Sequence, residues 1–296
     1  MTGTAGAGAD TPFAGPLVAD SDVARDMRDV DWSATPLGPP SQWPGALRDY
    51  VRMLLTSRFS MWMSWGPEQT MFYNDAYRRD TLRGKHPWAL GRPASEVWAE
   101  VWEQVTPQVR AVLDHGESTW DEDLQLYVVR NGWPEESFHT FSYSPLADAE
   151  ARVQGLLCVV TETTGQVLAQ RRMSFLRDLA AAVSSARSIP DVAASLRGVL
   201  DRDGRDVPFG LLYLVDESTG DRAHLAAAVG TRPGGSAAPA VVPLDGTGVW
   251  SLDAAAREVT VVEVPGVDVL AAGPDDDGVP ADCDRCLLYT SDAADE

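Results

Sequence analysis

The apolar residues Met61, Met63 and Trp65 occupy every second position of one short stretch. A period of two residues is typical of a strand with one buried face, so these three side chains are predicted to point into a core. A Gly-Pro pair at 66–67 predicts a turn, and a second short apolar run predicts a partner strand at 70–73. The pattern therefore predicts a β-hairpin.

Apolar residues at helical spacing recur on both sides of this hairpin. One such stretch follows Ser41, which is expected to be the N-cap of a helix. A second covers 95–115, where Pro107 is expected to kink or split the helix. Two further stretches, 166–187 and 191–200, have the same periodicity and predict helices.

Three further strands are predicted after the middle helix, at 120–129, 137–144 and 153–161. The first two are joined by Asn-Gly at 131–132, a strong signal for a tight hairpin turn. After the leading hairpin, Asn74 is expected to cap a short helix. A leading hairpin, a helical middle and three trailing strands predict an α+β fold with a five-stranded antiparallel sheet.

Composition narrows the classes of protein to consider. The 296 residues allow about two domains, and the net charge of −20 repels phosphate backbones and anionic lipids. We therefore expect no binding to nucleic acid or membrane. Three Cys without a signal peptide indicate reduced thiols in a cytoplasm, and the longest apolar run, 155–160, is too short to span a bilayer.

Two strings give the first half of the chain a family resemblance. Trp-Gly-Pro-Glu at 65–68, followed by Tyr-Asn-Asp-Ala-Tyr at 73–77, resembles the PAS repeats of bacterial signalling proteins. The Pro-rich stretch 31–40 is predicted to be extended, with Trp32 and Leu37 docked on the next domain. Together with the helix that follows, it looks like a leader that often precedes such PAS domains in sensor kinases.

The second half resembles the opening of a GAF domain. It has a predicted hairpin at 209–215 and 223–229, followed by a loop, helix and strand within 246–262. The further strands and closing helix of a GAF domain are missing from the sequence. Residues 286–296 reverse-translate into a transposase-type sequencing adapter, so we expect the natural reading frame to stop being recorded near Arg285.

These observations predict six segments. They are a disordered lead (1–30), a leader segment and helix (31–58), a PAS domain (59–164), a linking helix (165–187), a partial GAF domain (188–285) and the adapter-derived tail (286–296).

Any ligand is expected on the concave face of the PAS sheet, in an apolar pocket with few polar groups. The residues predicted to line it are Met63, Trp65, Trp98, Phe141 and Tyr143. The alternative is that these aromatic side chains fill a solid core. A small molecule is thus a candidate partner, and the sequence requires no cofactor.

Thr161, Glu162 and Thr163 resemble the junction through which PAS domains connect to their output helices. The helix that follows, 165–187, is predicted either to pack on its own domain or to form a two-stranded coiled coil with a second copy. By the second reading, the protein is a homodimer.

No catalytic motif and no metal-ligand set is present in the sequence. A haem-binding PAS domain would use a His as axial ligand, and His86 and His139 are the candidates. Cys158 lies in an apolar strand and is expected to be a small buried thiol, not a reactive flavin-binding Cys.

The resemblance implies a non-catalytic sensory and dimerising input region, most often that of a two-component histidine kinase whose output domain is missing here. Two alternatives stay open. The same input could regulate a metal-dependent serine/threonine phosphatase, or it could be a standalone module that binds a small ligand or haem.

Overall fold

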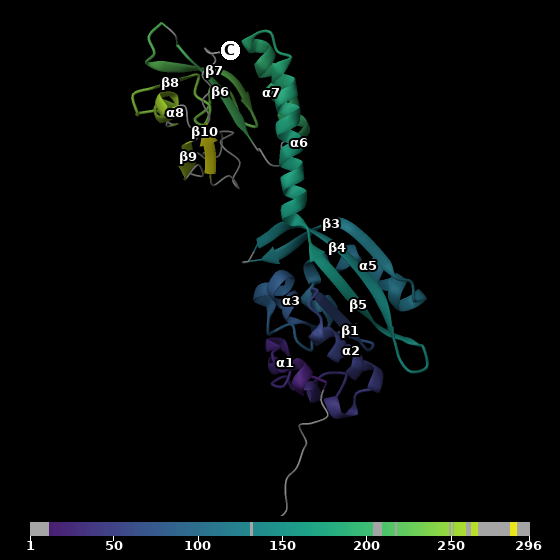
Figure 1. The fold of residues 1–296 in the computed structure, drawn as a ribbon. Coiled ribbons are helices and arrows are strands. Elements are labelled where there is room, and N and C mark those ends of the chain that lie inside the picture. Colours follow the sequence, from purple (N-terminus) through teal and green to yellow (C-terminus); the bar gives the residue numbers. More distant parts are fainter. Residues whose placement is uncertain are drawn as a thin grey trace, which may run out of the picture. The chain divides into compact units, whose positions relative to one another are not determined.

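The structure is a computed structural model. It describes residues 12–130, 133–203, 209–216, 218–248, 250, 252–258, 262–265 and 285–288. The chain divides into two compact units, Met1–Leu168 and Ala169–Glu296, which are described separately (Figure 1).

The first unit is built on one antiparallel sheet of five strands in the order β2-β1-β5-β4-β3. The strands are β1 Met61–Trp65, β2 Thr70–Tyr73, β3 Thr119–Arg130, β4 Trp133–Ala147 and β5 Val153–Glu162. The predicted α+β fold and the predicted hairpin are confirmed. The strands β3 and β4 extend beyond the predicted ranges, and the predicted turn at 131–132 lies outside the described residues.

Short helices surround this sheet. They are η1 Pro16–Val18, α1 Asp22–Asp26, η2 Trp32–Ala34, η3 Pro40–Gln42, α2 Gly45–Thr56, α3 Asp75–Tyr77, a π-helical turn Arg78–Leu82, η5 Arg83–Lys85, α4 Ala94–Val97 and α5 Ala99–His115. Asn74 caps α3 as predicted, because its side chain accepts a hydrogen bond from the amide of Tyr77.

Two details of the helices differ from the prediction. Ser41 lies inside η3, and Pro44 is the N-cap of α2. The break in the middle helix falls at Trp98, while α5 continues through Pro107. Pro107 is exposed and lies inside the helix, which is not split there. A lost hydrogen bond is one cost of a proline inside a helix.

Residues 12–44, which are called the leader from here on, are part of the fold. Residues 12–30, which we expected to be disordered, form η1 and α1 and bury Phe13, Val18 and Met27 in the hydrophobic core. Residues 1–11 lie outside the described part of the chain. Trp32 docks on the domain as predicted, although it sits in a short 3₁₀ helix instead of an extended segment.

The leader explains why β1 is buried on both faces, where its alternation predicted only one buried face. Met63 pairs with Phe72 of β2, so both side chains project from the same face of the sheet. The ring of Phe72 stacks on Trp32 at 5.2 Å and meets Trp43 edge-on at 5.5 Å. This outer face is therefore closed by the leader and by α2, which packs against β1 and β2 (Figure 1).

Three polar side chains of α5, spaced four residues apart, cover the free edge of β3. Glu100 accepts a hydrogen bond from the amide of Val129, and Gln104 donates to the carbonyl of Gln125. Gln108 donates to the carboxylate of Asp121. An unpaired edge strand invites pairing with other chains, and this row of side chains occupies part of that edge.

The helix α6 Thr164–Ser184 begins in the first unit and continues into the second. The second unit also contains the elements that follow this helix. These are α7 Ile189–Asp203, β6 Gly210–Val215, β7 Arg222–Val229, β8 Val241–Pro243, α8 Leu252–Glu258, β9 Val262–Pro265 and β10 Arg285–Leu288. The strands form one sheet in the order β6-β7-β8 and a separate β9-β10 pair.

The predicted hairpin of the second unit is confirmed as β6 and β7. A small core of Phe209, Ala237, Val242 and Trp250 lies beside it. Assignment of this unit to the GAF family stays a prediction, as does the adapter origin of 286–296. Of that tail, only 286–288 are described, and they pair with β9.

On α6, Phe175 is buried and packs with Leu179 against Val199 and Leu200 of α7. These side chains therefore take part in packing within their own unit, and the coiled coil with a second copy stays a prediction. In the part of the chain that the structure describes, no helix is both long enough and apolar enough to cross a membrane.

Candidate functional site

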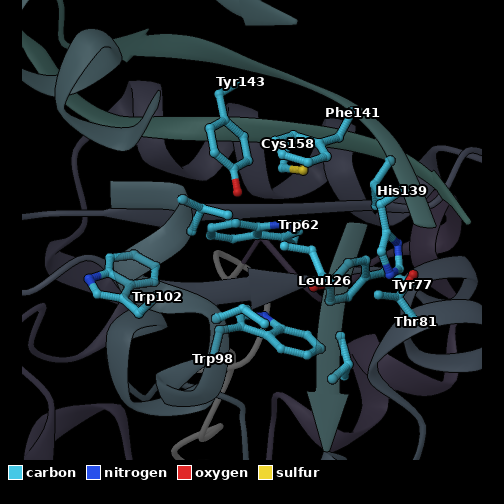
Figure 2. Close-up of a pocket in the computed structure, with 14 residues that line it drawn as sticks. Trp62, Tyr77, Thr81, Trp98, Trp102, Leu126, His139, Phe141, Tyr143 and Cys158 are labelled. Atoms are coloured by element: carbon cyan, nitrogen blue, oxygen red, sulfur yellow. The ribbon is translucent and has the colours of Figure 1, made fainter. Parts of the chain in front are cut away.

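The first unit contains a partly open cavity of about 50 Å³ between the inner face of the sheet and the helices α3 to α5 (Figure 2). Its walls are mostly aromatic and aliphatic. The lining residues are Trp62, Tyr77, Thr81, Trp98, Val101, Trp102, Val105, Leu126, Val128, His139, Phe141, Tyr143, Cys158 and Val160.

The structure brings together three of the five predicted pocket residues, Trp98, Phe141 and Tyr143. Met63 and Trp65 lie on the outer face of β1, and Trp62 takes the inner position. The period of two residues was correct. However, Met63 and Trp65 were predicted to face the pocket because both are apolar, and they face the other side of the sheet. Trp62 shares its face of the strand with Ser60 and Ser64, and this one large aromatic residue was the signal for the inner face.

Besides the hydroxyls of Tyr77 and Tyr143, two polar side chains, His139 and Thr81, line this mostly apolar cavity, and both appear at the same side of Figure 2. His139 is buried, with its Nε2 3.1 Å from the hydroxyl of Ser137. Because that hydroxyl donates to the carbonyl of Leu126, it is left to accept from His139. The geometry thus places a proton on Nε2. Thr81, the second polar residue, lies in the π-helical turn.

Two tyrosine hydroxyls and one thiol in the walls are held in their neutral forms. Burial raises the pKa of the Tyr77 and Tyr143 hydroxyls well above the usual value, and it raises the pKa of the Cys158 thiol as well. Cys158 is buried, as predicted, and its protonated thiol is a poor nucleophile. Among the residues that the structure describes, no Asp, Glu, Lys or Arg lines the cavity.

The wall formed by Trp98 is held from outside the cavity. The ammonium of Lys85 lies 4.2 Å from the centre of the Trp98 ring. The same ammonium is 2.6 Å from a carboxylate oxygen of Glu100 and 2.6 Å from the carbonyl of Val97. These contacts fix the break between α4 and α5 and with it the orientation of the indole.

The predicted junction lies where β5 ends and α6 begins. The amide of Thr163 donates to the carbonyl of Phe138 on β4, and its hydroxyl donates to Asp123 on β3 at 2.6 Å. Glu162 lies 3.8 Å from the guanidinium of Arg83, whereas the side chain of Thr161 is exposed. The start of α6 is therefore tied to the two strands that carry much of the cavity wall.

His86, a candidate haem ligand, lies outside the cavity. Its Nδ1 is 2.8 Å from the hydroxyl of Tyr73, and its Nε2 is 2.9 Å from the carboxylate of Asp26 in α1. Burial lowers the pKa of His86, and the nearby Arg78 lowers it further. His86 thus connects the leader to β2. No cluster of three or more potential metal ligands occurs among the described residues.

Comparisons with known proteins agree with this architecture. Residues 67–168 match the family model described as PAS fold. The PAS domain of a protein from Colwellia psychrerythraea is 14% identical, with a TM-score of 0.32, over 40% of this chain and 98% of that one. The PAS domain of Bordetella pertussis BvgS is 15% identical, with a TM-score of 0.28, over 44% and 96%.

A sensory box sensor histidine kinase from Vibrio cholerae is 10% identical, with a TM-score of 0.29, over 39% of this chain and 89% of that one. At such identities and TM-scores, these likenesses carry no argument about function. No curated protein sequence matched the chain.

The five-stranded antiparallel sheet, with helices and a partly open cavity on its inner face, defines the first unit as an α+β domain. With the family match, which covers about a third of the chain, this part of the protein is a PAS domain.

Proposed function

We propose that the protein is the sensory input region of a signalling protein, in which the state of the PAS cavity is passed to α6. The observation that carries this proposal is the hydrogen bond between Thr163, at the start of α6, and Asp123 on β3. Leu126 and Val128 of the same strand line the cavity. A ligand that displaces β3 must therefore strain or break the contact that holds the helix.

The shape of β3 supports this role for Asp123. The pairing of β3 with β4 is interrupted between Asp121 and Leu124, and Asp123 has a positive φ of 50°. Such bulges redirect a side chain and are frequent beside functional sites. Asp123 also accepts a hydrogen bond from Thr140 of β4. One carboxylate therefore gathers β3, β4 and the start of α6.

The experiment is hydrogen–deuterium exchange of the full chain with Thr163→Val, which removes the hydroxyl and keeps the shape of the side chain. We expect amides in the first turns of α6 to exchange roughly tenfold to a hundredfold faster, because an anchoring hydrogen bond to a carboxylate contributes about 1.5–3 kcal/mol. Thr161→Val, two residues away and exposed, is the matched control. Equal exchange in the two variants would refute the coupling.

We propose further that α6 mediates homodimerisation through a face not used for packing within its unit. Along this face, apolar residues follow the four-then-three spacing of a coiled-coil seam, and Met173 and Leu176 are 67% and 55% exposed. The seam consists of Ala169, Met173, Leu176, Ala180 and Val183.

Salt dependence offers a test of this dimer. In a parallel pair with this seam, Arg172 of one helix would face Arg177 of the other, so screening should favour association. We expect sedimentation to show tighter association at 0.5 M than at 0.05 M NaCl. Leu176→Glu should dissociate the dimer, and Arg177→Glu should tighten it at low salt. A monomer under all conditions would overturn the proposal.

The output that this region controls is proposed from the resemblance of the leader and junction to those of sensor histidine kinases. A gene that continues into a phosphoacceptor helix and an ATP-binding domain would support this proposal, and a phosphatase domain would replace it with the alternative. Haem sensing is disfavoured by size, since cofactor pockets typically measure about 300 Å³ or more, against about 50 Å³ here.

A further inference from the structure

The hydroxyl of Thr81 is a buried polar group without a partner. Thr81 is 7% exposed, its Oγ1 makes no hydrogen bond, and the residue lines the cavity. Leaving a buried hydroxyl unpaired destabilises a fold, so each such group calls for an explanation. A ligand that hydrogen-bonds to Thr81 would satisfy it.

The backbone around Thr81 points in the same direction. Thr81 lies in the π-helical turn Arg78–Leu82. Single π-helical turns are rare, cost regular hydrogen bonds and occur frequently at functional sites. Here the turn presents the hydroxyl to the cavity, with His139 at the same side of the close-up (Figure 2).

The other walls decide the charge of the ligand. Trp62, Trp98 and Trp102 present indole rings, and in the described part of the chain no Asp, Glu, Lys or Arg side chain lines the space. A charged ligand would lose its hydration without gaining a counter-ion, a large cost in an apolar site. The cavity therefore favours an uncharged molecule.

The volume of the cavity limits the size of the ligand. An engineered cavity of about 150 Å³ lined by aliphatic side chains and Phe binds benzene. The present cavity, at about 50 Å³, has about a third of that space. Since one water-sized group needs roughly 10–15 Å³ of such space, a molecule of about four heavy atoms is near its limit, and a ring compound requires the side chains to move.

We propose that the PAS cavity takes a small uncharged molecule with an apolar body and one hydrogen-bonding group, such as a short-chain ketone or alcohol, which pairs with Thr81. This assignment of ligand class rests on the proposed function, in which the same cavity is the sensing site. The indole rings contact the apolar body, and the hydroxyl of Thr81 donates to the oxygen of a ketone.

Acetone and acetate form a matched pair of probes, because they have nearly the same shape and differ in charge. We expect acetone to shift the indole N–H signals of Trp62 and Trp98 in nuclear magnetic resonance titrations of the full chain. Its affinity should be no tighter than roughly 40 µM, the ceiling for about four heavy atoms. Acetate should produce no saturable shift.

Thr81→Val removes the hydroxyl and keeps the volume, so it should weaken acetone binding about five- to a hundredfold. Thr81→Ser keeps the hydroxyl and should bind acetone within about threefold of the wild type. Because the hydroxyl is unpaired, Thr81→Val should also raise the melting temperature of the free protein. Acetate binding as tight as acetone binding, or unchanged acetone affinity in Thr81→Val, overturns the proposal.

The test of the ligand class and the test of the proposed coupling to α6 can fail independently. If acetone binds through Thr81 and exchange in α6 is unaltered, the coupling fails and the ligand class stands. If Thr163→Val loosens α6 and acetone does not bind, the ligand class fails and the coupling stands.

Discussion

The two faces of the PAS sheet are built from alternate residues of the same strands and end in opposite states of packing. On the outer face, Met63 and Phe72 are fully buried beneath Trp32 and Trp43. On the inner face, Trp62 borders a cavity. The strand sequence places large side chains on both faces, so residue type alone does not decide which face is solid.

The difference comes from what covers each face. The leader delivers indole rings that stack on Phe72 and donate their N–H groups to main-chain carbonyls of the leader itself. The inner face is covered by short helices with a break at Trp98 and a π-helical turn at Thr81, which cannot follow the sheet closely. A chain of tightly packed rings stabilises one face, while irregular helices leave space at the other.

The largest expected effect is on the solid face. Trp32→Ala should lower the free energy of unfolding by about 3–5 kcal/mol, since it empties a site between packed rings. Trp102→Ala, at the half-buried edge of the cavity, should cost about 1–2 kcal/mol. Urea denaturation measures both. Equal losses would break the contrast between a solid and a hollow face.

The next largest effect is expected at Asn74, which connects the two faces of the sheet. Its amide donates to the carbonyls of Ser57 and Phe59 after α2, and its oxygen accepts from the amides of Met61 and Tyr77. Asn74→Ala should cost about 2–4 kcal/mol, because several buried groups lose their partner.

Asn74→Asp is the informative companion, because it keeps the acceptor and loses the donor. Its melting temperature should lie between those of the wild type and Asn74→Ala. If Asn74→Asp were as stable as the wild type, the bonds to α2 would contribute nothing, and the faces would be joined by the cap of α3 alone.

The attachment of the leader should depend on pH through His86. Burial lowers the pKa of His86 in the folded protein, so as the pH falls the unfolded chain binds the proton first, near its usual pKa of about 6.5. The stability from neutral His86 is complete above that pH and is lost as the pH falls below it. His86→Gln should flatten this part of the profile between pH 8 and 5.

The charged neighbours of His86 act in opposite directions, which makes this test sharp. Arg78 lowers the pKa, while Asp26 and Asp75 raise it. Arg78→Gln should therefore reduce the loss of stability in acid. If acid stabilised the wild type relative to His86→Gln, the pair with Asp26 would outweigh burial.

The smallest effect is expected at the edge of the sheet. Gln104→Ala removes one hydrogen bond to the carbonyl of Gln125 and should cost about 0.5–1 kcal/mol. Amides near the middle of β3 should exchange somewhat faster, whereas those of β1 should be unchanged. A change in β1 of equal size would mean that the edge contacts stabilise the whole sheet.

Local signals in the sequence predicted local structure well. Asn74 was identified as a helix cap because capping depends on neighbours within three residues, and the structure shows this bond. The hairpin followed from a Gly-Pro turn between apolar runs. Thr163 was placed at the junction because the junction has a recognisable string.

Features that depend on distant contacts were missed. Asp123 contacts Thr163 across forty residues, and no pattern marks it in the sequence. Which side of the sheet borders the cavity, and so where Trp62 lies, depends on the leader, because the leader closes the opposite side of β1. Thr81 was missed because an unpaired hydroxyl becomes visible only when the surrounding atoms are placed.

The match to the PAS family model begins at residue 67, two residues after β1 ends and within the turn that leads to β2. The rings that seal the back of the sheet come from residues before that point. A gene fusion that transplanted only the matched segment would carry half a hairpin and expose Phe72 to water. Protein engineers who move this PAS domain into another chain should therefore transfer the leader with it.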